Sequence, residues 1–141
     1  MKLSQISDIA VSGLLAQRMR MVVTASNLAN VNTTRTAEGG PYQRRDPVFE
    51  SVPVSGPFAN RLDREIGAVR VPRIEFDARP GALRFDPGHP DADEEGFVRL
   101  PNVDPIEELA NVISASRSYE ANLVTLRKAR EMSDATLRIG R

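Results

Sequence analysis

The sequence predicts an α+β protein in which two long terminal helices pair as an antiparallel coiled coil beside a small, mainly β middle module. Two observations support this prediction. Both ends of the 141-residue chain repeat apolar residues every three or four positions and contain almost no glycine or proline. The middle contains nine of the ten prolines and only short apolar groups. We therefore divide the chain into residues 1–34, 35–102 and 103–141.

The C-terminal stretch, residues 104–139, has a well-marked helix start. Asp104 can accept hydrogen bonds from the first-turn N–H groups, Pro105 suits the first helical position, and Glu107 completes a capping box. No glycine or proline follows before Gly140, which suits a helix end. Apolar residues form a seam with the seven-residue period of a supercoiled helix. The seam comprises Leu109, Val112, Ser116, Tyr119, Leu123, Leu126, Arg130, Ser133 and Leu137, and Ile113, Ala129 and Met132 widen it.

Residues from about Ser4 to Asn30 predict the second long helix. It ends in an asparagine-rich stretch, residues 25–34, whose side chains can bond local backbone and terminate a helix. The C-terminal helix would be roughly 50 Å long at 1.5 Å per residue, too long to pack within one small domain, so it needs a partner helix. The simplest partner is the other terminal helix. The N-terminal seam comprises Val11, Leu14, Arg18, Met21, Ala25 and Leu28.

Short apolar groups separated by turn residues predict strands in the middle segment. The best supported strand lies between Asp63 and Asp77. Its alternation of apolar and polar residues slips at Pro72, as at a bulge or an edge strand. The apolar groups are residues 48–49, 52–54, 69–71, 74–76, 83–85 and 97–100.

Composition argues against several classes of function. The 19 basic and 19 acidic residues balance, so no basic surface for nucleic acid is expected. The absence of cysteine excludes disulfides, thiolate metal sites and cysteine catalysis. No window approaches the roughly 18 apolar residues of a membrane span, and the N-terminus lacks the pattern of a cleavable secretory signal.

Recognisable catalytic motifs are missing, so we expect no enzyme activity, cofactor or metal. His89, the only histidine, lies in a turn without an accompanying nucleophile motif. Asp91, Asp93 and Glu95 imitate the first half of a calcium loop, but Asn102 stands where the bidentate glutamate is needed. A solvated acidic turn is the simpler interpretation, and a metal-dependent enzyme built on residues 91–95 is the alternative.

The helix seams point to assembly, although an amphipathic stripe is also what an ordinary helical bundle needs. Arg18, Ser116 and Arg130 place polar groups in the seams, where they weaken a closed core but can specify register with other chains. The helix surfaces are also rich in small polar residues such as Ser114 and Asn122, rather than in lysine and glutamate. We therefore expect an assembly subunit. A self-contained bundle, or a soluble binding module such as an export chaperone or adaptor, is the alternative.

The order of motifs along the chain resembles the FlgC family of bacterial flagellar proximal rod proteins, a branch of the axial rod and hook proteins. Residues 25–34 (Ala-Ser-Asn-Leu-Ala-Asn-Val-Asn-Thr-Thr) resemble the asparagine-rich signature of the whole axial group. The stretches that resemble the FlgC branch itself are 42–45 with Val48-Phe49, 86–93, 96–105 and 113–122. The resemblance covers nearly the whole chain.

This resemblance implies a structural subunit whose terminal helices pack beside those of neighbours to form the inner tube of the rod, in homo- and hetero-oligomeric helical assembly. It implies export without a cleavable signal through the flagellar type III apparatus and a place in the periplasmic rod of the basal body. The implied partners are other proximal rod proteins, the export-gate adaptor at the rod base and distal rod proteins. We expect the helix ends to fray in solution and to order on assembly. The expected assembly positions are Leu14, Met21, Asn27, Leu28, Asn30, Leu109, Val112, Ile113, Tyr119, Leu123 and Leu126.

Overall fold

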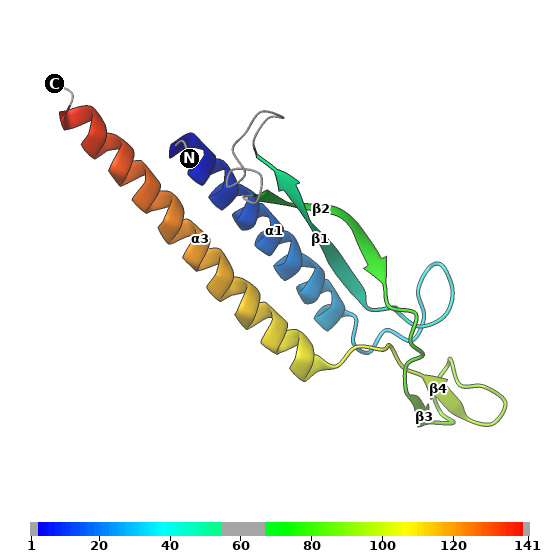
Figure 1. The fold of residues 1–141 in the computed structure, drawn as a ribbon. Coiled ribbons are helices and arrows are strands. Elements are labelled where there is room, and N and C mark those ends of the chain that lie inside the picture. The colour runs from blue at the N-terminus through cyan, green and yellow to red at the C-terminus, as the bar shows by residue number, and fades with distance from the viewer. Residues whose placement is uncertain (1–2, 55–66, 140–141) are drawn as a thin grey trace.

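Two long helices run side by side in opposite directions and form the body of the protein (Figure 1). The fold is taken from a computed structural model that describes residues 3–54 and 67–139. Helix α1 spans Leu3–Ala29 and helix α3 spans Pro105–Ile139. The predicted α+β class is confirmed, and both helices lie where the sequence predicts them.

The helix boundaries follow from local hydrogen bonding. Asp104 caps α3, since its Oδ1 accepts hydrogen bonds from the N–H groups of Ile106 at 2.8 Å and Glu107 at 3.4 Å. At the other boundary, the carbonyl of Ser26 in the last turn of α1 accepts from the side-chain amide of Asn30 at 2.8 Å as well as from the Asn30 N–H at 3.2 Å. The expected stop at Gly140 lies outside the described residues.

The two helices meet through small and polar side chains, which differs from the predicted contact between apolar seams. The guanidinium of Arg20 donates to Asn111 Oδ1 at 2.8 Å, and the Asn27 amide donates to Glu108 Oε2 at 3.0 Å. The α1 seam lies largely outside this contact, since four of its six residues are exposed: Val11, Arg18, Ala25 and Leu28. Coiled-coil packing of the pair therefore stays a prediction. The buried residues of the two helices are Ala10, Ala16, Val23, Thr24, Asn27, Glu108, Ala115, Leu126 and Ala129.

Gly13 of α1 faces the side chain of Asn122 on α3. A Cβ atom there would lie 2.7 Å from Asn122 Nδ2, the far end of a flexible side chain. We expect Gly13→Ala to be nearly neutral or stabilising, because the amide can move aside and alanine gains up to about 1 kcal/mol of helix propensity. Gly13→Leu should lower the free energy of unfolding by about 1–3 kcal/mol, because the larger side chain forces the helices apart. Urea unfolding of the two variants tests this, and equal stability would contradict it.

A first antiparallel hairpin packs along α1. It is formed by β1 (Arg45–Pro53) and β2 (Gly67–Phe76). The N–H of Val69 donates to Ser12 Oγ at 3.0 Å and ties the hairpin to α1. The register shifts between Val48 and Glu50, opposite Val71-Pro72, so the predicted irregularity at Pro72 is confirmed. The segment 63–66 of the predicted strand lies outside the described residues.

A second, shorter hairpin lies beyond the end of the helix pair (Figure 1). It is formed by β3 (Leu83–Phe85) and β4 (Phe97–Arg99), which pair antiparallel. The connection from β4 to α3 passes the end of α1, so residues from all three parts of the sequence meet at this junction.

Candidate assembly surface and its polar joint

Each long helix carries an apolar face that this chain leaves open to solvent. On α1, Leu15 is 60% exposed and Val22 58%. On α3, Leu109 is 54% exposed and Ile113 48%. At 3.6 residues per turn each of these pairs lies on one side of its helix, and we call the two sides together the exposed stripes. The stripes comprise Val11, Leu15, Met19 and Val22 of α1 and Ile106, Leu109, Ile113 and Val124 of α3.

Where the helices meet the middle module, four buried polar side chains form a connected cluster, which we call the polar joint. It comprises Asn27, Tyr42, Arg44 and Glu108. The Tyr42 hydroxyl donates to Asn27 Oδ1 at 2.9 Å, which also accepts from the Arg45 N–H at 3.0 Å. The Asn27 amide donates to the Arg45 carbonyl at 2.9 Å and to Glu108. One asparagine therefore links α1, the start of β1 and α3.

An ion pair lies at the centre of the polar joint. Arg44 Nε donates to Glu108 Oε1 at 2.6 Å, and the Glu108 side chain is 0% exposed. Burial by itself lowers the pKa of Arg44, but hydrogen bonds and charge from Asp46 and Glu108 outweigh it and raise this pKa above its usual value. Arg44 therefore stays charged and supplies the positive partner that a buried carboxylate requires.

The polar joint extends toward the second hairpin through Asn102. Its Oδ1 accepts from the Arg44 N–H at 2.8 Å, and its amide donates to the Asp77 carbonyl at 3.0 Å. At the surface, hydrogen bonds from the Arg79 side chain and N–H lower the pKa of Asp77 from 3.8 to about 2. The two segments that enter and leave the second hairpin are thereby tied to the helices.

Comparison with known proteins shows the family to which this chain, with its exposed stripes and polar joint, belongs. Residues 8–35 match the family model for the flagella basal body rod protein, and residues 94–139 match that for the flagellar basal body rod FlgEFG protein C-terminal region. The flagellar basal-body rod protein FlgC of Borreliella burgdorferi is 44% identical over 94% of this chain and 93% of its own length. The chain belongs to the FlgC family. The FlgC protein of Yersinia enterocolitica is 43% identical over 99% of both chains, and that of Bacillus subtilis 37% over 95% of both.

As a member of the FlgC family, the chain is a structural subunit of the flagellar basal-body rod. The described residues contain no helix long and apolar enough to cross a membrane. Within the same ranges, no group of three or more histidine, aspartate or glutamate side chains could hold a metal ion.

The structure places the predicted assembly positions in three environments. Leu28, Leu109 and Ile113 are exposed, and Asn27 and Leu126 are buried within the chain. Asn27 is engaged in the polar joint, so any contribution it makes to assembly is through the shape of the subunit. Contact with a neighbouring subunit stays a prediction for every position. The half-buried positions are Leu14, Met21, Asn30, Val112, Tyr119 and Leu123.

Sequence reasoning missed the polar joint. The position of Glu108 in the first turn of α3 predicts only a favourable interaction with the helix dipole, whereas this residue is the buried partner of Arg44. One signal was available, because Tyr42-Gln43-Arg44-Arg45 is among the stretches that resemble the FlgC family. Its partners lie 15 residues away at Asn27 and 64 residues away at Glu108, and nothing in the local pattern identifies them.

Proposed function

We propose that this chain is a non-catalytic subunit of the proximal part of the rod that assembles through the exposed stripes. The observation that carries the proposal is the large apolar side chains on the open faces of α1 and α3, such as Leu15 and Ile113. Exposed apolar faces of this kind mark surfaces that are covered by other chains. The buried polar joint would hold the middle module in a set direction while neighbours pack on the helices.

The proposed neighbours are other proximal rod proteins, the export-gate adaptor at the rod base and distal rod proteins. Contacts between different surfaces of successive subunits generate helical assemblies, as an axle that transmits torque and surrounds an export channel requires. We propose that the chain reaches the rod through the flagellar type III apparatus. The absence of cysteine suits such a route, because no disulfide has to be opened for passage as an unfolded chain. Fraying of the helix ends before assembly stays a prediction.

Isolation of intact hook–basal bodies from the source cells, followed by mass spectrometry, tests this proposal. Stable recovery of the chain with the rod under conditions that strip peripheral proteins is the expected result. Recovery only in the cytoplasm, in a small complex with an axial protein, would overturn it in favour of the soluble export chaperone or adaptor. Recovery of the Ile113→Asp variant in the rod at native levels would overturn the role of the exposed stripes.

A further inference from the structure

We propose that the end of the second hairpin of one copy docks into a groove on the middle module of a second copy. This contact does not involve the exposed stripes. It rests on the proposed function, because it requires several copies to lie together in the rod. We call the docking element the tip: β3, β4 and the turn between them, residues 83–99.

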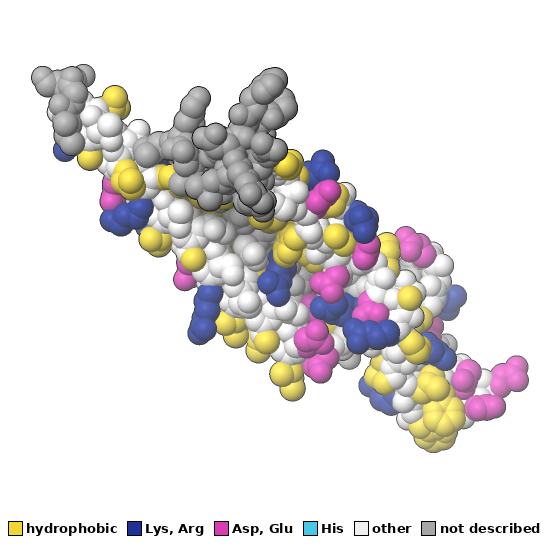
Figure 2. Space-filling view, in the orientation of Figure 1, with side chains coloured by type: hydrophobic (Ala, Val, Ile, Leu, Met, Phe, Trp, Pro, Cys, Tyr) yellow, Lys and Arg dark blue, Asp and Glu magenta, His cyan; other side chains and the backbone are white. Residues whose placement is uncertain are grey.

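The tip combines an apolar face with an acidic turn. Leu83 and Phe85 are 57% and 64% exposed, and they share one face of β3 because alternate residues of a strand point the same way. Phe97 packs edge-on against Phe85, with 5.3 Å between the ring centroids. On the opposite face Val98 is 1% exposed, while Arg84, its partner across the hairpin, is exposed. Figure 2 shows this apolar patch, with acidic side chains beside it, at the end of the molecule that carries β3 and β4.

The turn of the tip is held in shape by its own hydrogen bonds. Asp93 Oδ1 accepts from the N–H groups of Glu95 at 3.1 Å and Phe97 at 2.8 Å. Glu94 and Glu95 are exposed, and neither takes part in an ion pair within residues 3–54 and 67–139. A preformed element with free carboxylates loses little conformational entropy when a basic surface binds it.

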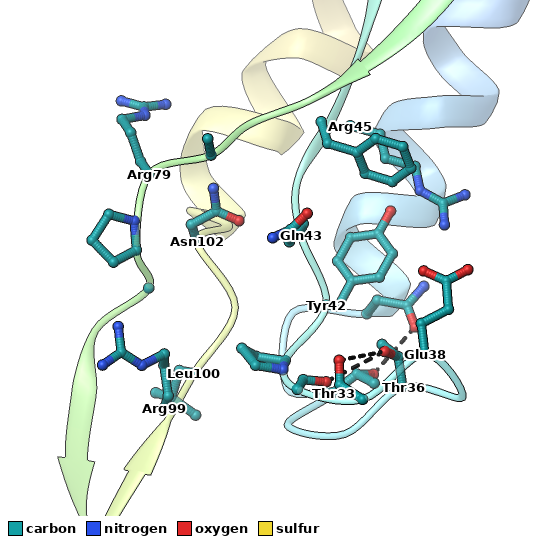
Figure 3. Close-up of a pocket in the computed structure, with 18 of the residues that line it drawn as sticks. Thr33, Thr36, Glu38, Tyr42, Gln43, Arg45, Arg79, Arg99, Leu100 and Asn102 are labelled. Atoms are coloured by element: carbon teal, nitrogen blue, oxygen red, sulfur yellow. Dashed lines mark hydrogen bonds between the residues drawn. The ribbon is translucent and has the colours of Figure 1, made fainter.

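A groove of about 860 Å³ lies between the loop at residues 36–41 and the segments 76–81 and 99–102 (Figure 3). Arg79 and Arg99 come from one wall and Arg45 from the other, and Glu38 is the only acidic residue of the lining. Asp77, beside the lining, pairs with Arg79, so the net positive charge of the groove comes from Arg45 and Arg99 against Glu38. Its apolar lining comprises Ala37, Pro41, Tyr42, Phe76, Ala78, Pro80 and Leu100.

The tip and the groove are complementary in two respects: apolar against apolar, and acidic against basic. Charge complementarity of this kind selects partner and register. Arg99 is well placed to pair with an acidic residue of the tip of another copy, because its side chain is exposed and forms no ion pair within the described residues.

The tip cannot occupy the groove of its own copy. Arg99 is the last residue of β4 and also lines the groove, so folding back would break the β3–β4 pairing. The complementarity of apolar surface and charge favours the tip of another copy as the occupant. Apart from Arg99, which belongs to both, the tip and the groove are built from different residues, so the contact is head-to-tail and can continue from copy to copy.

Disulfide cross-linking tests this contact without background from native cysteine, since the chain has none. Glu95→Cys in the tip and Ala78→Cys in the groove replace exposed side chains. Both variants are expressed together with the native chain, so that rod assembly does not depend on them. Hook–basal bodies are isolated and oxidised, and cross-linked products are identified by mass spectrometry. We expect an Ala78→Cys/Glu95→Cys dimer, severalfold above the matched control that pairs Ala78→Cys with Glu120→Cys, an exposed acidic position on α3.

A charge exchange separates specific docking from chance encounter. Adding Arg99→Glu to the Ala78→Cys copy should abolish the dimer, and adding Glu94→Lys to the Glu95→Cys copy should restore it. A yield equal to that of the control, or a product that joins Ala78→Cys to a different rod protein, would overturn the proposal. Recovery of the chain in the same basal bodies without the dimer would leave the proposed rod function standing and refute the docking of the tip alone.

Discussion

Replacing Arg44 with methionine is expected to destabilise the isolated chain by about 3–5 kcal/mol, because the change leaves a buried carboxylate without its cation. Glu108 is fully buried, and Arg44 is the only basic residue paired with it within the described parts of the chain. For a chain of this size the loss corresponds to a fall in Tm of roughly 10–17 °C. Urea unfolding and thermal unfolding, each followed by circular dichroism, measure it.

Two further variants make this result interpretable. Arg73→Met breaks an ion pair with Glu75 in which both side chains are more than half exposed, and it should cost no more than about 1 kcal/mol. Arg44→Met combined with Glu108→Leu removes both charges and should recover part of the lost stability, because no buried charge is left unpaired. If Arg44→Met and Arg73→Met lowered the free energy of unfolding equally, burial of the ion pair between Arg44 and Glu108 would make no difference to stability.

Replacing Ile113 with aspartate is expected to abolish swimming while leaving the isolated chain folded. Ile113 is 48% exposed, so the free subunit keeps the new carboxylate in water and should change in stability by less than about 0.5 kcal/mol. If a neighbouring subunit covers the exposed stripe, the same carboxylate is buried without a partner at a cost of several kcal/mol. Swimming in soft agar of cells that carry the variant as their only copy measures the effect.

Ile74→Asp is the matched control, since it makes the same isoleucine-to-aspartate change at a 40% exposed position of β2, outside the exposed stripes. Cells with this variant should swim, and the purified chain should unfold like the native one. Leu123→Asp is less informative, because Leu123 is half-buried and its replacement disturbs folding as well as assembly. Normal swimming with Ile113→Asp, with the variant present in the rod, would remove the exposed stripe of α3 from the assembly surface.

Local chemistry made the helices, the main strands and the family predictable. The cap at Asp104 needs only the first turn of α3, and it forms as the sequence indicates. The slip at Pro72 is likewise a local property of one strand and appears as a register shift. The stretches that resemble the FlgC family are contiguous along the chain, so recognising them does not depend on which residues meet in space.

The sequence by itself therefore determined where the two long helices lie and to which family the chain belongs. Only the tertiary structure decided which faces meet. A heptad pattern measures how apolar residues repeat on one helix, but the contact that forms depends on Gly13 fitting Asn122 and on Arg20 reaching Asn111. The pairing of Arg44 with Glu108 joins residues 64 positions apart. Such pairs depend on the shapes of two elements and on the hydrogen-bond geometry between them. The spacing of residues along one element specifies neither of these.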